Sequence, residues 1–317
     1  MIGYVIRRVL YVMPIAVGVT VMIFALVHLA PGDPLSAVVA ADAPAEVVQQ
    51  LKEAYGFDRP LPIQYGRWLW RAVQGDFGTS IATGRPVAQA LVKAVPNTLI
   101  LAVFAALLGF TLGCVLGAFA GYWQGRALDK LATGVAVAGV SVPHYWLGLV
   151  LVIVFAVELN ALPAMGMGPG GSGAWAWDAE HLRHLVLPVV TLSVIPMGIV
   201  TRTLRAAVAE ILQQEFVQAL HAKGLWSHQV LVHVVKNAAP TVLAVLGLQF
   251  GYLLGGSILV ETVFSWPGTG FLLNDAIFRR DIPLLQGTIL VLALFFVFLN
   301  LLVDILQTAI DPRMRRT

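Results

Sequence analysis

The sequence predicts an all-α, polytopic membrane protein with six transmembrane helices. Of its 317 residues, 58% are hydrophobic and 12% are charged, whereas soluble proteins carry about 25% charged residues. Several apolar runs reach the roughly 18 residues that a membrane-spanning helix needs. Membrane strands would alternate apolar and polar residues over about ten positions, and the sequence lacks that pattern. The composition therefore excludes a soluble globular protein and favours helical spans.

Six apolar runs supply the predicted spans. The first follows Arg7 and Arg8 and is too long for a signal peptide, so we expect it to stay uncleaved. PGDP at 31–34 ends this span, because two prolines and a glycine do not continue a helix. The other five spans are predicted at about 96–121, 131–159, 185–201, 241–260 and 287–310.

The segment 31–96 is mixed in polarity and is predicted to lie outside the cytoplasm. Tyr65, Trp68 and Trp70 stand among basic residues there, a pattern typical of amphipathic helices at a membrane–water interface. We therefore divide the chain into two parts. Residues 1–96 hold the first span and this amphipathic segment, and residues 97–317 form a five-helix core with a loop at about 202–240.

The charges of the short loops predict the orientation in the membrane. With six spans both termini lie on one side, and short loops on the cytoplasmic side of a membrane are enriched in Lys and Arg. On the side of the termini, basic residues outnumber acidic ones; they are Arg7, Arg8, Arg126, Lys130, Arg202, Arg205, Lys223, Lys236, Arg313, Arg315 and Arg316. We therefore expect cytoplasmic termini and a cytoplasmic loop at 202–240.

The loop from Arg202 to Pro240 is the longest polar, helix-patterned interval of the chain. Apolar residues recur in it at three- and four-residue spacing, which predicts an amphipathic helix with one face to bury. We expect Gly224 to end that helix and Ser227 to cap a second one. Such a hairpin on a membrane protein could lie on lipid, close a pore or dock a partner.

Two nucleotide-binding motifs can be judged from the sequence. GMGPGG, from Gly166 to Gly171, matches G-x-G-x-x-G, but a dinucleotide site needs a strand before it and a helix after it in a cytoplasmic unit. This stretch falls in a predicted extracytoplasmic loop, so we expect a plain turn. The phosphate-cradling pattern G-x-x-x-x-G-K-[ST] is absent, so we do not expect this chain to hydrolyse ATP by that mechanism.

No catalytic, cofactor or metal site is predicted. His181 and His184 would share a helix face, but a metal site needs at least three converging ligands, so we expect an interfacial role for them. No Ser-His-Asp set or carboxylate pair is readable. The single cysteine, Cys114, lies in an apolar run and cannot form an internal disulfide. A nucleic-acid partner is not expected.

A few polar residues fall within or beside the predicted spans. His144 follows Pro143 in the third span, where a polar side chain either packs against another helix or lines a path. Asn300 and Asp304 share one face of the sixth span, for which helix packing or anchoring is favoured over proton relay. The candidates for a translocation path or gate are Ser141, Pro143, His144, Glu261, Pro267, Asn300 and Asp304.

Motifs along the whole chain resemble one family. The C-terminal half carries ETVFSWPGTG at 261–270, RRDIPLLQG at 279–287 and NLLVDILQTAIDPRMR at 300–315. The N-terminal half adds PGDP at 31–34, GDFGTS at 75–80, PNTL at 96–99 and SVPHYWLG at 141–148. With these motifs the chain resembles the permeases of bacterial ABC importers, in the first-subunit (dipeptide-permease B) type of the dipeptide/oligopeptide/nickel family. This implies the type I ABC importer permease fold and the cell inner membrane.

The resemblance also implies an ATPase-coupling loop after the fourth span. The family pattern E-A-A-x-x-x-G places its glycine at Gly224 and its triplet at Gln218, Ala219 and Leu220, of which only the alanine is kept. The family also has a local pattern, [DE]-[YF]-[IV]-x-x-A-[RK]-A-K-G. This chain departs from it at two positions, with Leu220 in place of the alanine and His221 in place of the basic residue. The implied coupling residues are Glu215, Phe216, Gln218, Ala219, Leu220, His221, Ala222, Lys223 and Gly224.

The resemblance further implies partners and a substrate class. It implies a second permease subunit in a heterodimer, two cytosolic ATPases, and an extracytoplasmic solute-binding protein. Peptides are the first expected substrate, with nickel, a metal chelate or glutathione as alternatives. An ion-coupled secondary transporter is the rival class, but it would show paired intramembrane ionisable residues and often inverted repeats. A membrane enzyme is less favoured because no catalytic set is readable.

Overall fold

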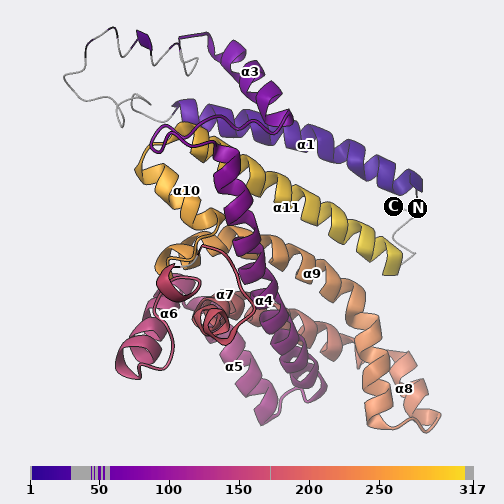
Figure 1. The fold of residues 1–317 in the computed structure, drawn as a ribbon. Helices are drawn as coiled ribbons and strands as arrows, with labels where there is room; N and C mark the ends of the chain where they lie inside the picture. Colours follow the sequence, from indigo (N-terminus) through magenta and orange to yellow (C-terminus); the bar gives the residue numbers. More distant parts are fainter. Residues whose placement is uncertain are drawn as a thin grey trace. The chain divides into compact units, whose positions relative to one another are not determined.

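The computed structural model describes residues 2–29, 44, 46, 49–50, 53, 58–171 and 173–310. These residues form an all-α fold, and the predicted fold class is confirmed (Figure 1). Apart from the isolated bridge between Thr79 and Pro86, the described part of the chain contains no strand pairing. The helices are α1 (Ile2–Leu29), α3 (Leu61–Val73), α4 (Val87–Tyr122), α5 (Ala127–Ser141), α6 (His144–Leu151), the π-helix η2 (Val152–Glu158), the 3₁₀ turn η3 (Pro169–Gly171), α7 (Ala179–Ile211), α8 (Glu215–Ala222), α9 (Ser227–Val263), α10 (Thr269–Phe278) and α11 (Ile282–Ile310).

Four of the described helices are long and apolar enough to cross a membrane: α4, α7, α9 and the part of α11 from Ile282 to Val303. The pair formed by α5 and α6 with η2 would be a fifth span if its two halves cross as one. Helix α1 has a shorter apolar stretch, Leu10–Ala25. The predicted count of six depends on α1 and on the bent pair, and it stays a prediction.

The chain forms two compact units whose boundaries fall inside α4, after Trp266 and inside α11. Among the described residues, unit 1 contains those of 99–266 and 299–310, and unit 2 contains those of 2–98 and 267–298. The motif ETVFSWPGTG therefore divides between the units at Trp266 and Pro267. The predicted division of the chain at residue 96 stays a prediction.

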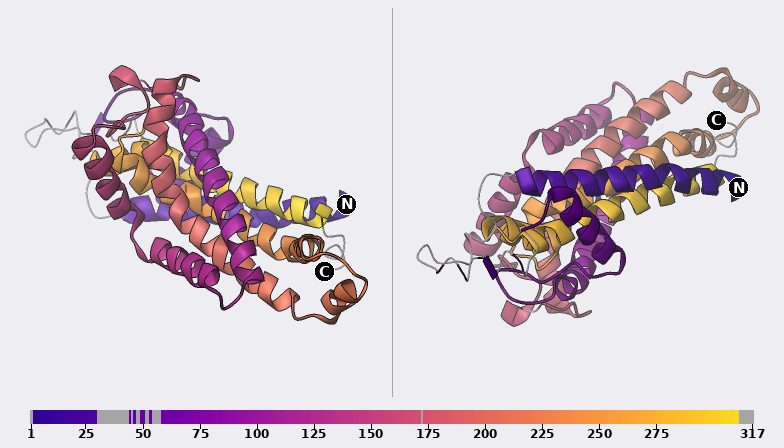
Figure 2. Two further views of the ribbon diagram at one scale, coloured as in Figure 1. Left: turned by 90° about the horizontal axis from the view of Figure 1, so that it is seen from below. Right: turned by 90° about the horizontal axis from the view of Figure 1, so that it is seen from above.

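Helix α7 is the central helix of unit 1. It contacts α5, α6 and α9, and its course can be followed by colour in Figure 2. Its apolar window has the largest buried share of the four spans, 61%. Four glycines on α4, at four-residue spacing, let that helix approach α7 closely. A Cβ at any of them would lie within 3 Å of an α7 backbone oxygen; they are Gly109, Gly113, Gly117 and Gly121. This contact is a close-packed helix pair of the kind that small residues permit in membranes.

Helix α5 and the segment formed by α6 and η2 are a sharply bent pair in unit 1, either a broken span or a re-entrant loop. The sequence predicts one span with a kink at Pro143, but the axes of the two halves differ by 99°. Helix α5 ends at Ser141, Val142 has an extended backbone, and Pro143 caps α6. Because proline cannot donate a backbone hydrogen bond and restricts the residue before it, the chain turns here instead of bending gently.

Unit 2 is held together by apolar, polar and aromatic contacts of its own. Val87 and Leu91 of α4 pack with Ala276 of α10 and Leu284 of α11 in one buried cluster. Helix α3 lies on α1, where the hydroxyls of Tyr65 and Thr20 are 2.8 Å apart. Tyr65 and Trp68, predicted to be interfacial, contact Phe24 of α1 through their rings.

The predicted hairpin at 202–240 is built differently from the sequence expectation. One helix was expected to run to Gly224, but α7 ends at Ile211 and α8 begins at Glu215. The second helix does not stop at Pro240 either, since α9 runs from Ser227 to Val263 through that proline. The result is a short helix, α8, held between the ends of two long ones.

Candidate functional site

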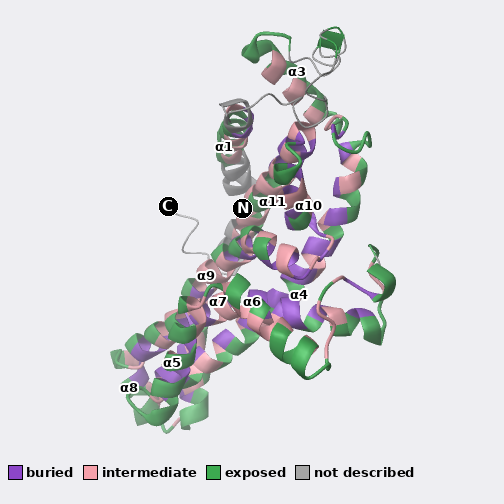
Figure 3. Ribbon diagram, turned by 90° about the vertical axis from the view of Figure 1, so that its left-hand side faces the viewer, coloured by how far each residue is buried: buried purple, intermediate pink, exposed green. Residues whose placement is uncertain are grey.

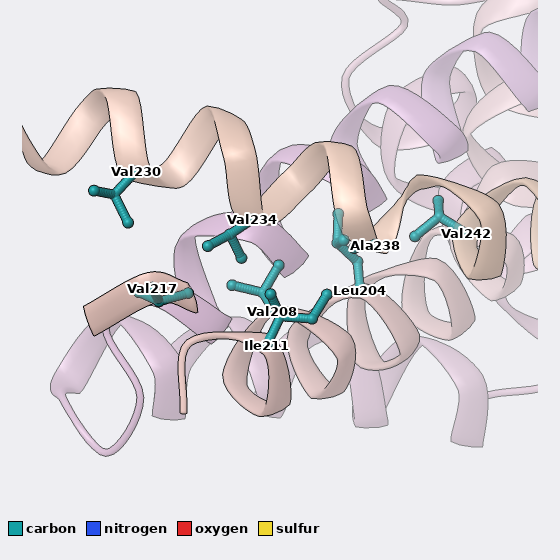
Figure 4. Close-up of a cluster of buried hydrophobic side chains, with 8 residues drawn as sticks. All are labelled: Leu204, Val208, Ile211, Val217, Val230, Val234, Ala238 and Val242. Carbon is teal, nitrogen blue, oxygen red and sulfur yellow. The ribbon is translucent and has the colours of Figure 1, made fainter. Parts of the chain in front are cut away.

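The short helix α8 carries the residues predicted to couple to the ATPases. Its single fully buried residue is Val217, which packs in an apolar cluster with residues of α7 and α9 (Figure 4). Phe216 and Leu220 are half-buried against the same cluster. The other members of the cluster are Leu204, Val208, Ile211, Val230, Val234, Ala238 and Val242. Helix α8 is thus fixed to the ends of both long helices by apolar packing.

The opposite face of α8 is exposed. Glu215, Gln218, Ala219 and Ala222 follow the i, i+3, i+4, i+7 spacing of one helix face, and all four are exposed (Figure 3). Leu220 stands where the family pattern has alanine, and it points into the cluster, so this departure leaves the outer face unchanged. The small residues at 219 and 222 let another surface approach the helix closely.

Gly224 ends α8, as the sequence predicts. Its φ is +81°, in the left-handed region, and its N–H donates to the carbonyl of His221 at 2.9 Å. The N–H of Leu225 donates to the carbonyl of Leu220 at 3.2 Å, which completes the helix-ending arrangement that glycine favours. His221 and Lys223 are exposed beside this turn.

The bend between α5 and α6 brings three predicted path residues together. Ser141 donates its hydroxyl to the carbonyl of Val137 at 2.8 Å and is exposed. Pro143 is exposed, and His144 is half-buried at the start of α6. The Nε2 atom of His144 is buried and has no hydrogen-bond partner among the described residues. The predicted role of these three residues in a path or gate stays a prediction.

Glu261 lies at the end of α9 in unit 1 and is completely buried. The turn that follows holds Phe264, whose carbonyl accepts from the N–H of Gly166 at 2.7 Å, and Trp266, whose N–H donates to the Glu261 carbonyl at 2.8 Å. Ser265 between them has a φ of +47°, a conformation unusual for a residue with a side chain. The residues around Glu261 are thus a tightly constrained turn.

Pro267 lies in unit 2, where the PNTL motif holds it. The side-chain amide of Asn97 donates to the Pro267 carbonyl at 2.8 Å. The hydroxyl of Thr98 accepts from the N–H of Thr269 at 2.7 Å and lies 2.9 Å from the Thr269 hydroxyl. Two motifs that are about 170 residues apart in sequence are therefore in direct contact.

The two predicted polar positions of the sixth span lie on α11. Asn300 is half-buried and has an interaction partner in the structure. Asp304 lies on the same helix, but its side chain is outside the described residues. Its predicted role in a path or gate stays a prediction.

The glycine-rich loop and the two histidines form a structural corner of unit 1. His181 is buried; its backbone N–H and its Nδ1 both bond Asp178 at 2.8 Å, and its ring meets that of Trp175. The bond from the His181 backbone N–H lowers the pKa of the Asp178 carboxyl. A Cβ at Gly168 would lie 2.4 Å from Nε2 of His181. Gly168 is therefore needed for close packing of GMGPGG on this imidazole. His184 makes a separate hydrogen bond to the Glu180 carbonyl.

Three kinds of residue that are prominent in the structure were not predicted from the sequence. The first is the glycine series on α4, which its four-residue spacing could have revealed. The second is Asp281, in the quoted motif RRDIPLLQG, which is completely buried and bonds to Ser80 of GDFGTS. The third is Asp129, which is buried and binds Arg205. No sequence signal links either aspartate to its distant partner.

Comparisons with known proteins agree with these features. Residues 113–316 match the family model described as the inner membrane component of binding-protein-dependent transport systems. Residues 1–102 match the model for the N-terminal part of such membrane components. The chain is 38% identical over 318 residues to the glutathione transport system permease protein GsiC of Escherichia coli strain K12. It is 36% identical to the corresponding protein of Salmonella paratyphi A, and both matches cover 99% of each chain.

A solved structure supports the fold. The solved structure of inward-facing conformations of the MetNI methionine ABC transporter superposes with a TM-score of 0.59 at 16% identity, covering 70% of this chain and 97% of that one. At this identity the likeness supports the type I importer permease fold alone. Together with the two family models, which match nearly the whole sequence, it identifies the chain as a membrane permease of the binding-protein-dependent ABC importer family.

Proposed function

We propose that this permease takes up short peptides, glutathione among them, in a complex powered by separate ATPase subunits. The support for the substrate class is the identity of 38% across the whole chain with glutathione permeases, since glutathione is itself a short peptide. Family membership implies a binding protein and an ATPase as partners. The finer assembly is a heterodimer with a second permease, two ATPases and one solute-binding protein, with no cofactor bound by this chain and no catalytic role for it.

The exposed face of α8 is the observation that carries the coupling role. A helix that is anchored on one side by Val217 and presents Glu215, Gln218, Ala219 and Ala222 on the other can dock in a groove of a partner. Because the chain lacks a phosphate-cradling motif, ATP is hydrolysed by a separate subunit. That subunit needs a surface of this chain on which to dock, and the exposed face of α8 provides one. In this assignment the loop and both termini lie in the cytoplasm.

The path is assigned to the bend at Ser141, Pro143 and His144 and to Glu261, Pro267, Asn300 and Asp304. ATP-driven closure of the partner subunits would move α8 and switch the path between outward- and inward-facing states. The broken span α5–α6 supports this assignment, because non-helical backbone at membrane depth is tolerated where it is buried in protein or lines a cavity.

One pair of experiments tests this proposal. The first identifies, by mass spectrometry, the ligand that co-purifies with the cognate binding protein. The second measures uptake of radiolabelled glutathione, dialanine and Ni²⁺ into liposomes that contain the complex. We expect the two peptides to be taken up with ATP and not with a proton gradient alone. Uptake of Ni²⁺ without either peptide would contradict the substrate class.

The docking role of α8 has its own test. Ala219→Arg places a long charged side chain at the centre of the exposed face. We expect the permease to be made in normal amounts and the ATPase subunits to be lost on purification. Ala127→Arg, the same change at an exposed alanine at the start of α5 and outside the coupling residues, is the matched control and should retain them. Normal recovery of the ATPases with Ala219→Arg would remove α8 as the docking helix.

A further inference from the structure

The carboxylate of Asp129 binds the guanidinium of Arg205 across two helices of unit 1. Asp129 lies in the first turn of α5, and Arg205 lies near the end of α7. Nη2 of Arg205 donates to Oδ2 of Asp129 at 2.8 Å, and Nε donates to Oδ1. This bidentate arrangement fixes the orientation of both groups as well as their distance. The Asp129 side chain is 5% exposed and that of Arg205 is 29% exposed.

Further contacts make the pair part of a rigid junction. The N–H of Gly125, in the turn between α4 and α5, donates to Oδ2 of Asp129 at 2.8 Å. The hydroxyl of Thr133 donates to Oδ1 at 3.2 Å. At the end of α4, Gly121 is so close to α7 that a Cβ on it would lie 2.7 Å from the Arg205 carbonyl oxygen. The ends of α4 and α7 and the start of α5 therefore meet around one carboxylate.

The junction lies between α8 and the bend of the broken span. Leu204 and Val208, on either side of Arg205 along α7, belong to the cluster that holds Val217 of α8. Helix α5 begins at the junction and ends at Ser141, where the chain turns by 99° into α6. A displacement of α8 would thus reach α7 by apolar packing and α5 by the ion pair. Contiguous packed elements of this kind are a physical route for coupling between sites.

We propose that Asp129 and Arg205 are positioning residues that carry the movement of α8 into α5 and so couple ATP hydrolysis to the path at the Ser141–His144 bend. The inference rests on the proposed docking of the ATPases on α8. The ion pair suits this task because it is directional and bidentate, so that a shift of Arg205 along or around α7 pulls α5 with it. Breaking the pair should leave the docking of the ATPases intact, but ATP hydrolysis should no longer move the Ser141–His144 bend.

The test uses the complete complex in liposomes, with the binding protein and whichever of radiolabelled glutathione or dialanine the unchanged complex takes up. The variants are Asp129→Asn, Arg205→Gln and the two changes combined. We expect the solute transported per ATP hydrolysed to fall at least fivefold in all three, while ATP hydrolysis stays within about twofold. Because the two residues act as one unit, the double variant should lose no more than either single one.

A second readout does not depend on the solute. In a Cys114→Ser background, Ser141→Cys reports on the bend through its rate of labelling by a maleimide. We expect ATP with vanadate to change this rate in the complex with the intact pair and to have less than one fifth of that effect with Asp129→Asn. If the rate does not respond to ATP even with the intact pair, the bend does not move with the ATPases and the proposal is wrong.

Two comparisons separate coupling from stability and from the docking of α8. Asp275→Asn breaks the exposed pair between Asp275 of α10 and Arg279, which directly follows that helix, and should leave the transport ratio unchanged. If Asp129→Asn does not assemble, Arg205→Lys keeps the positive charge and carries the test, with an expected intermediate ratio. An unchanged ratio in Arg205→Lys and Arg205→Gln overturns the coupling role. If the Arg205 variants keep a normal transport ratio while Ala219→Arg loses the ATPases, the coupling role of the ion pair is wrong and the docking of the ATPases on α8 is still supported.

Discussion

The hydroxyl of Ser80 donates to the carboxylate of Asp281, a residue that is completely buried in unit 2. The same carboxylate accepts from the N–H groups of Ile81, Ala82 and Leu284, each at 3.2 Å. The loop that follows GDFGTS is thereby held on the first turn of α11. A buried carboxylate with four donors is fully satisfied, and each donor depends on it in return.

Replacing this carboxylate should destabilise unit 2. Asp281→Asn removes the charge and turns an NH₂ group toward donors, so that buried N–H groups lose their acceptor at a cost of about 2–3 kcal/mol. We expect a clear fall in the midpoint of thermal unfolding in detergent. The matched control is Asp275→Asn on α10, whose carboxylate is partly exposed, and which should shift the midpoint little. Equal shifts in both variants would contradict the role given to Asp281.

The glycines of α4 should be intolerant of even one methyl group. A Cβ at Gly113 would lie 2.9 Å from the carbonyl oxygen of Met197 and from Cβ of Val200. Gly113→Ala must therefore push α4 away from α7, and overpacking of this kind costs about 1–3 kcal/mol. We expect a lower yield of folded permease and a lower unfolding midpoint.

Gly134 on α5 supplies the control for this change. A Cβ there would meet nothing within 4 Å, and alanine is favoured over glycine in a helix by about 1 kcal/mol. Gly134→Ala should leave the midpoint unchanged or raise it. If Gly113→Ala behaves like Gly134→Ala, the two helices do not depend on the glycine contact.

Gly224 should be needed for its left-handed backbone conformation and not for the absence of a side chain. A Cβ at this position would meet nothing within 4 Å, but φ is +81°. Valine resists this conformation, at a cost of about 1–2 kcal/mol, so Gly224→Val should displace the end of α8 and lower ATP-dependent uptake while the permease still assembles. Gly224→Asn is the control, because asparagine adopts positive φ more readily. Normal uptake by Gly224→Val would show that the exact end of α8 does not matter for coupling.

The corner around His181 should depend on Gly168. Alanine there would bring its Cβ to 2.4 Å from Nε2 of His181, so the imidazole must move away from Asp178 and Trp175. We expect Gly168→Ala to lower the unfolding midpoint, with Gly173→Ala as the control because nothing lies within 4 Å of its Cβ. A midpoint that is the same in both variants would mean that the His181 contacts add nothing to stability.

Loss of the Asp178 charge should weaken the start of α7 in acid. The hydrogen bond from the His181 N–H lowers the pKa of this carboxyl, so its stabilising effect is present above the ordinary pKa of aspartate and is lost as the pH falls through the lowered value. We expect Asp178→Ala to remove that part of the acid dependence of the unfolding midpoint. Identical acid profiles for the unchanged protein and the variant would exclude the effect.

The local pattern predicted the class of the protein and several individual positions. Apolar runs alone gave helical membrane spans, because a chain in lipid has to satisfy its backbone within each helix. Gly224 was recognisable as a helix end for the same local reason, its tolerance of positive φ. The break at Leu212 to Gln214, which separates α8 from α7, could not be recognised in the sequence. The apolar periodicity continues across it, and helix ends are poorly marked by sequence pattern.

Contacts between distant residues were decided by the tertiary structure. In the sequence Asp129 fits a short polar turn and Arg205 fits the polar face of a helix, and their pairing follows only from the packing of α5 on α7. Likewise GMGPGG matches a nucleotide motif by its letters, whereas in the fold Gly168 packs on His181. Composition and spacing act within a few residues along the chain and therefore determine spans and turns. The pairing of buried charges depends on how the long helices pack, and a short-range sequence pattern does not predict this packing.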